Sequence, residues 1–174
     1  QEVQRNFLTI EEIRKLSDAP CKSDQTKRAF LFTCFTGLRI SDVKKLTWDE
    51  IRDGYIEFTQ QKTDGVERLK LSESALNIID QQLNAKYNER KVFNLIHEVH
   101  TGKHIKKWAE DAGITKKVTW HVGRHTFATL ALTYGNDIYT VSKLLGHREV
   151  RTTQIYAKLI DKKKDEAIDK LPLI

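Results

Sequence analysis

The sequence His121-Val122-Gly123-Arg124-His125 opens a segment with helical periodicity. The periodicity predicts a helix from about Val122 to Gly135, where a glycine ends the helix at little cost. His121 and His125 stand four positions apart on this helix, a spacing that can bind zinc. No Glu follows His121 as a metalloprotease pattern requires, so no zinc site is predicted here.

Two helices are expected far upstream of this stretch. Thr9, followed three residues later by Glu12, can cap the first turn of a helix that runs to about Asp18. A second helix near residues 24–36 stops at Gly37, where a left-handed backbone is easily adopted.

A short third helix follows the glycine stop. Arg39 falls just past the end of the second helix. Ser41 and Asp42 can cap the third helix, which ends before Trp48.

A small antiparallel hairpin is expected between residues 55 and 71. Apolar and polar residues alternate there on both sides of Asp64-Gly65, a dipeptide typical of a tight turn. Lys62 stands just before that turn.

The remaining segments return to helical periodicity. Apolar residues at helical spacing predict helices around residues 76–83 and 105–112, and further helices are expected near residues 138–145, 152–159 and 163–171. No internal repeat or proline-rich linker is visible. The predicted fold is mainly α with a small antiparallel β-sheet, in one domain over residues 1–174.

Composition favours a nucleic-acid partner. The chain has 174 residues, a formal net charge of +6 and an isoelectric point of about 9.2, so basic residues are in excess. Only two cysteines occur, one of them within an apolar run, which is typical of reduced core thiols and of a cytoplasmic protein. No apolar stretch is long enough to cross a membrane. The chain contains no methionine, which suggests a piece of a longer polypeptide.

Three stretches near helix ends contain the arginine and histidine side chains most typical of a catalytic site, and a tyrosine follows the last of them. They are residues 36–42 (TGLRISD), residues 121–125 and residues 144–147 (LLGH), with Tyr156 nine positions after His147. In order and spacing they resemble the tyrosine recombinases, the integrase family of phage and mobile elements. The signature of that family is an Arg, a hairpin Lys, His-x-x-Arg, Gly-His and a Tyr.

The resemblance covers nearly the whole chain and implies the tyrosine recombinase catalytic-domain fold. Residues 124–129 and 153–158 are most similar to the integrases of bacterial conjugative transposons. The implied activity is site-specific DNA recombination through a 3′-phosphotyrosyl intermediate, which leaves a free 5′-hydroxyl. Gly123 departs from the family, which usually has a larger apolar residue at that position.

Tyr156 would attack a backbone phosphate held by Arg39 and Arg124. Two guanidinium groups suit the two non-bridging oxygens, on which negative charge develops, because each can present parallel donors. A phosphotyrosyl ester has an energy comparable to the bond broken, so rejoining needs no ATP. The sequence shows no carboxylate cluster suited to magnesium, and neither a metal nor another cofactor is predicted.

The resemblance assigns further roles to four residues. Lys62 would protonate the leaving 5′ oxygen. His121 would assist proton transfer, and His147 would donate a hydrogen bond to the phosphate. Asp42 would orient Arg39. Since no zinc site is predicted, His125 is interpreted as a residue that packs behind the site and supports it.

Each of these side chains also has a non-catalytic interpretation. Arginine and lysine are mostly solvated surface residues, and a tyrosine is often a core aromatic with its hydroxyl at the surface. Only Tyr156 has the spacing from Gly146-His147. The histidines at 97, 100 and 104 lack cysteine or carboxylate partners at zinc-like spacing and are interpreted as surface residues.

Three other functions compete with recombination. A type IB topoisomerase uses a similar tyrosine and similar arginines but relaxes DNA. A non-catalytic DNA-binding module has no need for this series of residues. A metal-dependent nuclease would be inhibited by a chelator and indifferent to loss of Tyr156.

The expected partner is double-stranded DNA, bound in a salt-dependent way. The family recombines DNA as a tetramer on two paired sites, and the isolated domain would be monomeric. A longer recombinase is expected to carry a separate N-terminal DNA-binding domain, which this sequence is not expected to include. Residues 161–174 could reach a neighbouring subunit or pack on their own domain.

Overall fold

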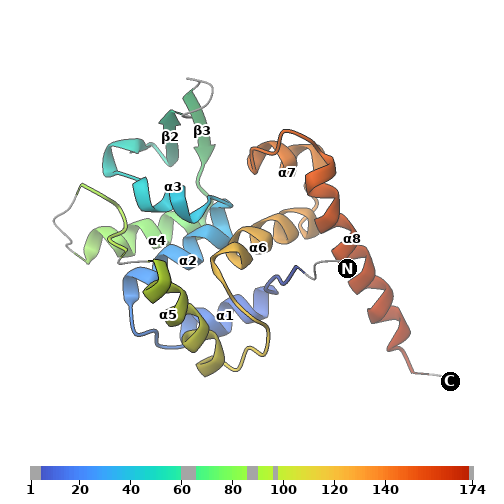
Figure 1. Ribbon diagram of the computed structural model, residues 1–174. Coiled ribbons are helices and arrows are strands. Elements are labelled where there is room, and N and C mark those ends of the chain that lie inside the picture. The colour runs from blue at the N-terminus through green and yellow to red at the C-terminus, as the bar shows by residue number, and fades with distance from the viewer. Residues whose placement is uncertain (1–4, 60–65, 86–89, 96–97, 173–174) are drawn as a thin grey trace.

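The computed structural model describes residues 5–59, 66–85, 90–95 and 98–172. It confirms the predicted class, a mainly helical fold with one small antiparallel sheet (Figure 1). The first helices and strands are α1 Ile10–Asp18, α2 Asp24–Thr36, α3 Ile40–Lys45, the 3₁₀ turn η1 Trp48–Glu50, β1 Ile51–Arg52, β2 Tyr55–Thr59 and β3 Val66–Lys70. The remaining helices are α4 Glu73–Asn84, α5 Glu98–Asp111, α6 Trp120–Thr133, α7 Ile138–Leu144 and α8 Arg151–Asp169.

Helices α2 and α6 form the centre of the domain. α2 carries the buried Phe30 and Phe32, and α6 contacts α2, α7 and α8. At Gly123 the two helices approach so closely that a Cβ added there would lie 2.1 Å from Oγ1 of Thr33. The departure at this position therefore has a packing reason, since Thr33 fills the space that a side chain at 123 would need.

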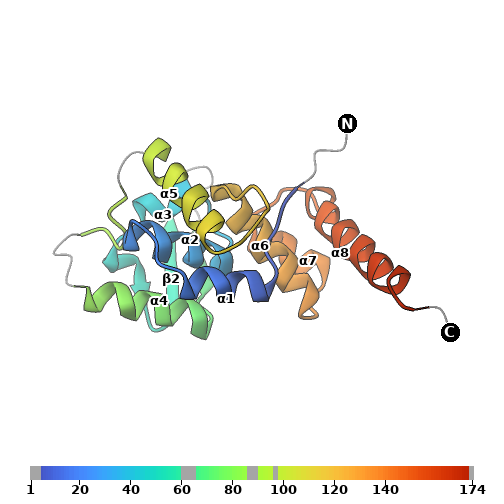
Figure 2. The same ribbon diagram turned by 90° about the horizontal axis from the view of Figure 1, so that it is seen from below.

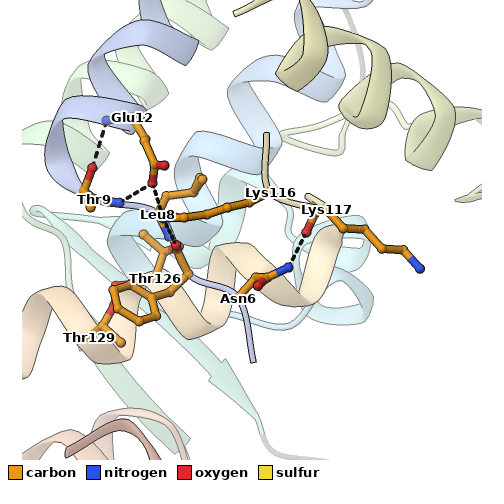
Figure 3. A network of polar contacts seen from close by, with 9 residues as sticks. Asn6, Leu8, Thr9, Glu12, Lys116, Lys117, Thr126 and Thr129 are labelled. Carbon is orange, nitrogen blue, oxygen red and sulfur yellow. Dashed lines mark hydrogen bonds and ion pairs between the residues drawn. The ribbon is translucent and has the colours of Figure 1, made fainter. Parts of the chain in front are cut away.

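Residues 5–9 are fastened along α6 before α1 begins. The Leu8 amide donates to Oγ1 of Thr126 on α6 at 2.9 Å. Lys116 donates to the Phe7 carbonyl. It also forms an ion pair with Glu12, and Figure 3 shows both of these residues beside Thr9 and Leu8. The capping box of Thr9 and Glu12 is confirmed, with both reciprocal bonds present.

The sheet has one strand more than predicted. β2 and β3 pair antiparallel with Ile56 opposite Leu69, as the alternation predicts, and β1 adds a short outer strand with Ile51 opposite Ile56. Asp53 and Gly54 join β1 to β2 with φ values of 50° and 78°. This Asp-Gly pair is the signal that could have predicted β1. Lys62 and the turn at Asp64-Gly65 lie outside the described residues.

Two expectations about helices were wrong. Ser41 and Asp42 do not cap α3, because the helix begins at Ile40 and places both residues inside its first turn. The two predicted C-terminal helices are one continuous helix, α8. Residues 160–162 contain no glycine or proline to interrupt it, and Asp161 pairs with Lys164 one turn later.

The second half of α8 leaves the body of the domain. Both views show the helix projecting beyond α6 and α7 toward the C-terminus (Figures 1 and 2). Ile168 and Leu171 are 66% and 65% exposed at this end. Among the described residues, no helix is long and apolar enough to span a membrane.

We predict that Gly123→Ala destabilises the domain. Overpacking against Thr33 should cost about 1–3 kcal/mol, which exceeds the gain of about 1 kcal/mol in helix propensity. Urea unfolding followed by circular dichroism measures the change. Adding Thr33→Ala removes the oxygen that lies nearest and should recover much of the loss.

Gly102 in α5 provides the matched control. A Cβ added there meets no atom within 4 Å, so Gly102→Ala should leave stability unchanged or raise it by up to about 1 kcal/mol. Equal effects of the two substitutions would contradict the close approach of α2 and α6.

Candidate active site

Arg124 connects three helices at the centre of the site. Its Nη1 donates to the Gly37 carbonyl at 2.6 Å, and its Nη2 donates to the Leu145 carbonyl at 2.5 Å. These carbonyls lie at the C-terminal caps of α2 and α7. A cation is favoured there because unpaired carbonyls and the helix dipole make such ends negative. The motif arginine therefore holds the other two motif loops against α6.

Arg39 enters the site because α2 stops at Gly37. That glycine has φ of 71°, and a Cβ there would lie 2.5 Å from the ring of Phe127, so only glycine fits the turn. Arg39 is exposed and becomes the N-cap residue of α3. Burial, and then the charge of Arg39, lowers the pKa of Arg124 to about 10, so the two guanidinium groups are close enough to repel.

Asp42 lies in the first turn of α3, with its amide bonded to the Arg39 carbonyl at 2.9 Å. Within the described part of the chain its carboxylate forms no ion pair with Arg39. Its negative charge instead acts on Arg124, opposing the fall in the pKa of that group. Asp42 thus contributes to the field of the site at a distance.

His147 reaches the same cluster from the turn after α7. Its Nδ1 lies 2.8 Å from Oγ1 of the buried Thr153, in the first turn of α8. Burial, followed by the charges of Arg124, Arg39 and Arg5, lowers the pKa of His147 to about 4. The imidazole is therefore neutral at pH 7, with its orientation set by Thr153.

Tyr156 lies on the first half of α8 and is only 2% exposed. Its ring belongs to a small apolar cluster formed with Ala128, Val141 and Leu145, between α6, α7 and α8. The hydroxyl meets Nδ1 of His125 at 2.7 Å. A buried tyrosine hydroxyl needs such a partner, and here the partner is on α6, one position after Arg124.

His125 was expected to pack behind the site, yet it contacts Tyr156 directly. Burial, and then the charges of Arg5, His121 and Arg124, lowers the pKa of His125 to about 4. Its imidazole is neutral at pH 7. A spacing of 31 residues between His125 and Tyr156 gave no local signal of this contact.

Arg5 is a neighbour of the site that the motifs did not indicate. Its guanidinium lies 5.9 Å from the centre of the Tyr156 ring, and its charge lowers the pKa of both His125 and His147. The bond from Leu8 to Thr126 brings the N-terminal segment to this place. A contact between residues 151 positions apart cannot be read from spacing along the chain.

His121 lies exposed in the first turn of α6, where its charge reaches His125. The structure thus brings together seven of the eight residues singled out from the sequence; Lys62 lies outside the described residues. Within the described part of the chain, no three histidine, cysteine or acidic side chains are placed to hold a metal ion. The site thus offers a tyrosine hydroxyl beside two guanidinium groups and two neutral imidazoles.

We predict that the free energy of unfolding falls as the pH is lowered from about 6.5 toward 4. The pKa values of His125 and His147 are near 4 when folded, against the usual 6.5, so the unfolded chain takes up protons first in that range. Urea midpoints at pH 7 and pH 5 measure the loss. The double variant His125→Gln, His147→Gln should lose less stability between these pH values; an equal loss would contradict the assignment.

Comparison with known proteins places this site in a family. Residues 6–163 match the phage integrase family. The tyrosine recombinase XerC of Caldanaerobacter subterraneus subsp. tengcongensis is 34% identical over 183 residues, which cover 96% of this chain and 51% of that protein. The crystal structure of XerA recombinase superposes with a TM-score of 0.77 at 27% identity, covering 97% of this chain and 66% of that chain.

Two more distant structures share the fold alone. A lambda integrase tetramer bound to a Holliday junction has a TM-score of 0.73 at 20% identity, covering 90% of this chain and 49% of that one. The integrase of transposon Tn1549 with transposon right end DNA has 0.70 at 17% identity, covering 87% and 61%. This chain spans about half to two thirds of the length of these four proteins. The chain belongs to the phage integrase family, that of the tyrosine recombinases.

Proposed function

We propose that this chain is the catalytic domain of an enzyme that cuts and rejoins DNA at specific sites, with Tyr156 as the nucleophile. The observation that carries the proposal is the position of the buried Tyr156 hydroxyl, beside neutral His125 and within the electrostatic reach of Arg124. Attack by Tyr156 would form a 3′-phosphotyrosyl bond and release a 5′-hydroxyl. The same bond, attacked by a 5′-hydroxyl of the partner strand, would reseal the DNA.

Arg39 and Arg124 would hold the phosphate. A guanidinium has five N–H donors, and Arg124 uses two of its nitrogens on main-chain carbonyls, which leaves donors for a ligand. Arg39 is exposed, and within the described residues neither arginine forms an ion pair. Both cations are therefore available to the charge that develops on the non-bridging oxygens.

His147 and His121 would make separate contacts with the phosphate and with the DNA backbone. Where the Thr153 hydroxyl donates to Nδ1 of His147, the neutral ring carries its hydrogen on Nε2 and can donate it to a phosphate oxygen. His121, exposed at the start of α6, would contact the DNA backbone beside it. Asp42 would moderate the positive charge of the arginines.

Lys62 would act as the general acid that protonates the leaving 5′ oxygen. Support for this role comes from the position of Lys62 in the sequence, between β2 and β3 of the hairpin. A lysine can serve this purpose where neighbouring cations lower its pKa. No part of the proposed reaction needs a metal ion or another cofactor.

For the whole protein we propose a longer polypeptide with an N-terminal DNA-binding domain, acting as a tetramer on two paired duplex sites in the bacterial cytoplasm. The relatives extend well beyond the matched region, and the lambda integrase structure is a tetramer on a Holliday junction. The exposed end of α8 could contact a neighbouring subunit. Service to a mobile element, such as a conjugative transposon, is part of the proposal, and the fold of the Tn1549 integrase is compatible with it.

We predict that Tyr156→Phe abolishes covalent attachment to DNA. The full-length polypeptide is incubated with a nicked suicide duplex that carries the end sequence of its own element, and the products are separated on a denaturing gel. The native protein should give a covalent protein–DNA band, and Tyr156→Phe should give none, because the phenyl ring lacks the attacking oxygen.

Tyr134→Phe provides the matched control. Tyr134 is 69% exposed at the end of α6, so its substitution should leave the band unchanged. A band that persists in Tyr156→Phe, or cleavage that a chelator abolishes, would point to another nucleophile or to a metal-dependent nuclease. A well-folded native protein without any covalent band would favour non-catalytic DNA binding.

A further inference from the structure

We infer that His125 accepts the proton of Tyr156 during attack, and that His121 does not. The inference rests on the proposed function and deepens it by naming the proton acceptor. It begins from the contact between the Tyr156 hydroxyl and Nδ1 of His125, which are 2.7 Å apart. His125 therefore touches the atom that would attack the phosphate.

The contact is built into the fold and does not depend on a flexible side chain. Arg124 fixes α6 against the ends of α2 and α7, and His125 is the next residue on that helix. The Tyr156 ring is held from the other side by Ala128, Val141 and Leu145. The centroids of the His125 and Tyr156 rings lie 5.5 Å apart, so the two side chains meet between α6 and α8.

His125 is in a protonation state that can accept the proton of Tyr156. Its surroundings are cationic: Arg5 reaches it from the N-terminal segment, His121 and Arg124 lie on its own helix, and Tyr156 faces it from α8. Burial and these charges keep the imidazole neutral at pH 7 and set its pKa at about 4. With the tyrosine hydrogen directed at Nδ1, the neutral ring carries its own hydrogen on Nε2.

DNA binding would strengthen this base. A phosphate held by Arg39 and Arg124 brings negative charge among the same cations that disfavour the imidazolium. Their effect on His125 is then offset, and its pKa rises toward the ordinary value for histidine. His125 would thus be a weak base in the empty site and a stronger one when a phosphate is in place.

The proton moves from Tyr156 to His125 during cleavage and returns during rejoining. As the bond from Tyr156 Oη to phosphorus forms, the Oη–H bond breaks and its proton moves to Nδ1 of His125. The P–O5′ bond breaks, and the 5′ oxygen leaves with a proton from the general acid. On rejoining, a 5′-hydroxyl attacks phosphorus, and Tyr156 departs with the proton that His125 returns.

His121 is placed differently from His125. It is exposed in the first turn of α6, four residues before His125, and no contact between it and Tyr156 occurs among the described residues. Its exposed position would allow His121 to contact the DNA backbone beside the phosphate site. The two histidines can therefore be compared by the same substitution at each.

The test replaces His125 by Asn and by Leu in the full-length polypeptide. The Asn oxygen can lie near the position of Nδ1 and accept the tyrosine hydrogen bond, but it cannot take up the proton. Cleavage of the nicked suicide duplex at pH 7 should fall by about 100-fold or more in both variants. If His125 only positioned the hydroxyl, His125→Asn would stay within a few-fold of the native rate, and the inference would be overturned.

The pH dependence separates loss of a base from loss of structure. Without His125 the tyrosine must lose its proton to solvent, so the rate of His125→Asn should rise about tenfold per pH unit between pH 7 and 9 while the native rate stays nearly level. His121→Asn should slow cleavage by a factor that does not change with pH. A pH-dependent deficit in His121→Asn and a constant one in His125→Asn would reverse the assignment.

Two controls complete the test. His100→Asn, at an exposed position of α5, should cleave at the native rate, and urea unfolding should show that both His125 variants are folded. In nitrogen NMR of the native protein at pH 7, Nδ1 of His125 should be unprotonated; a protonated Nδ1 would overturn the inference without any cleavage assay. A native protein that forms no covalent band refutes the proposed function, whereas a native band that His125→Leu leaves undiminished refutes only the role of His125.

Discussion

The two hydrogen bonds from Arg124 to the Gly37 and Leu145 carbonyls hold the site together. α2 and α7 come from distant parts of the sequence, and each presents the carbonyl of its C-terminal cap to Arg124 of α6. One half-buried guanidinium satisfies both of these ends at once, which a lysine ammonium on a flexible stem cannot do in the same fixed geometry. Arg39 and His147 each lie two residues beyond one of the bonded carbonyls, so their positions depend on Arg124.

The same arrangement concentrates positive charge without neutralising it. Burial, and then the charge of Arg39, lowers the pKa of Arg124 to about 10. Burial, followed by the charges of nearby cations, lowers the pKa values of His125 and His147 to about 4. Repulsion between Arg39 and Arg124 is a cost to the empty domain. A bound phosphate relieves that cost, so affinity for the anion and the basicity of the histidines increase together. The repulsion between the arginines therefore lowers the stability of the empty domain and favours binding of an anion.

Local chemistry made much of the fold predictable, and tertiary contacts account for what was missed. The capping box at Thr9, the glycine stop at Gly37 and the alternation around Ile56 each act within a few residues, so sequence reasoning found them. The contact between His125 and Tyr156 depends instead on how α6 packs on α8, and motif spacing alone left His125 a supporting role. Arg5 was missed for a similar reason, because only the bond between Leu8 and Thr126 brings its segment to Tyr156.

Gly123 shows how packing and chemistry share one helix. Residues 121, 124 and 125 lie at spacings of three and four and so share a face of α6, while Gly123 turns toward Thr33 of α2. A glycine in a helix costs about 1 kcal/mol relative to alanine, which makes this residue unfavourable for α6 taken alone. A side chain there would push α6 away from α2, between which Arg124 makes its 2.6 Å bond to the Gly37 carbonyl. The glycine therefore belongs to the site, because it sets the distance over which Arg124 acts.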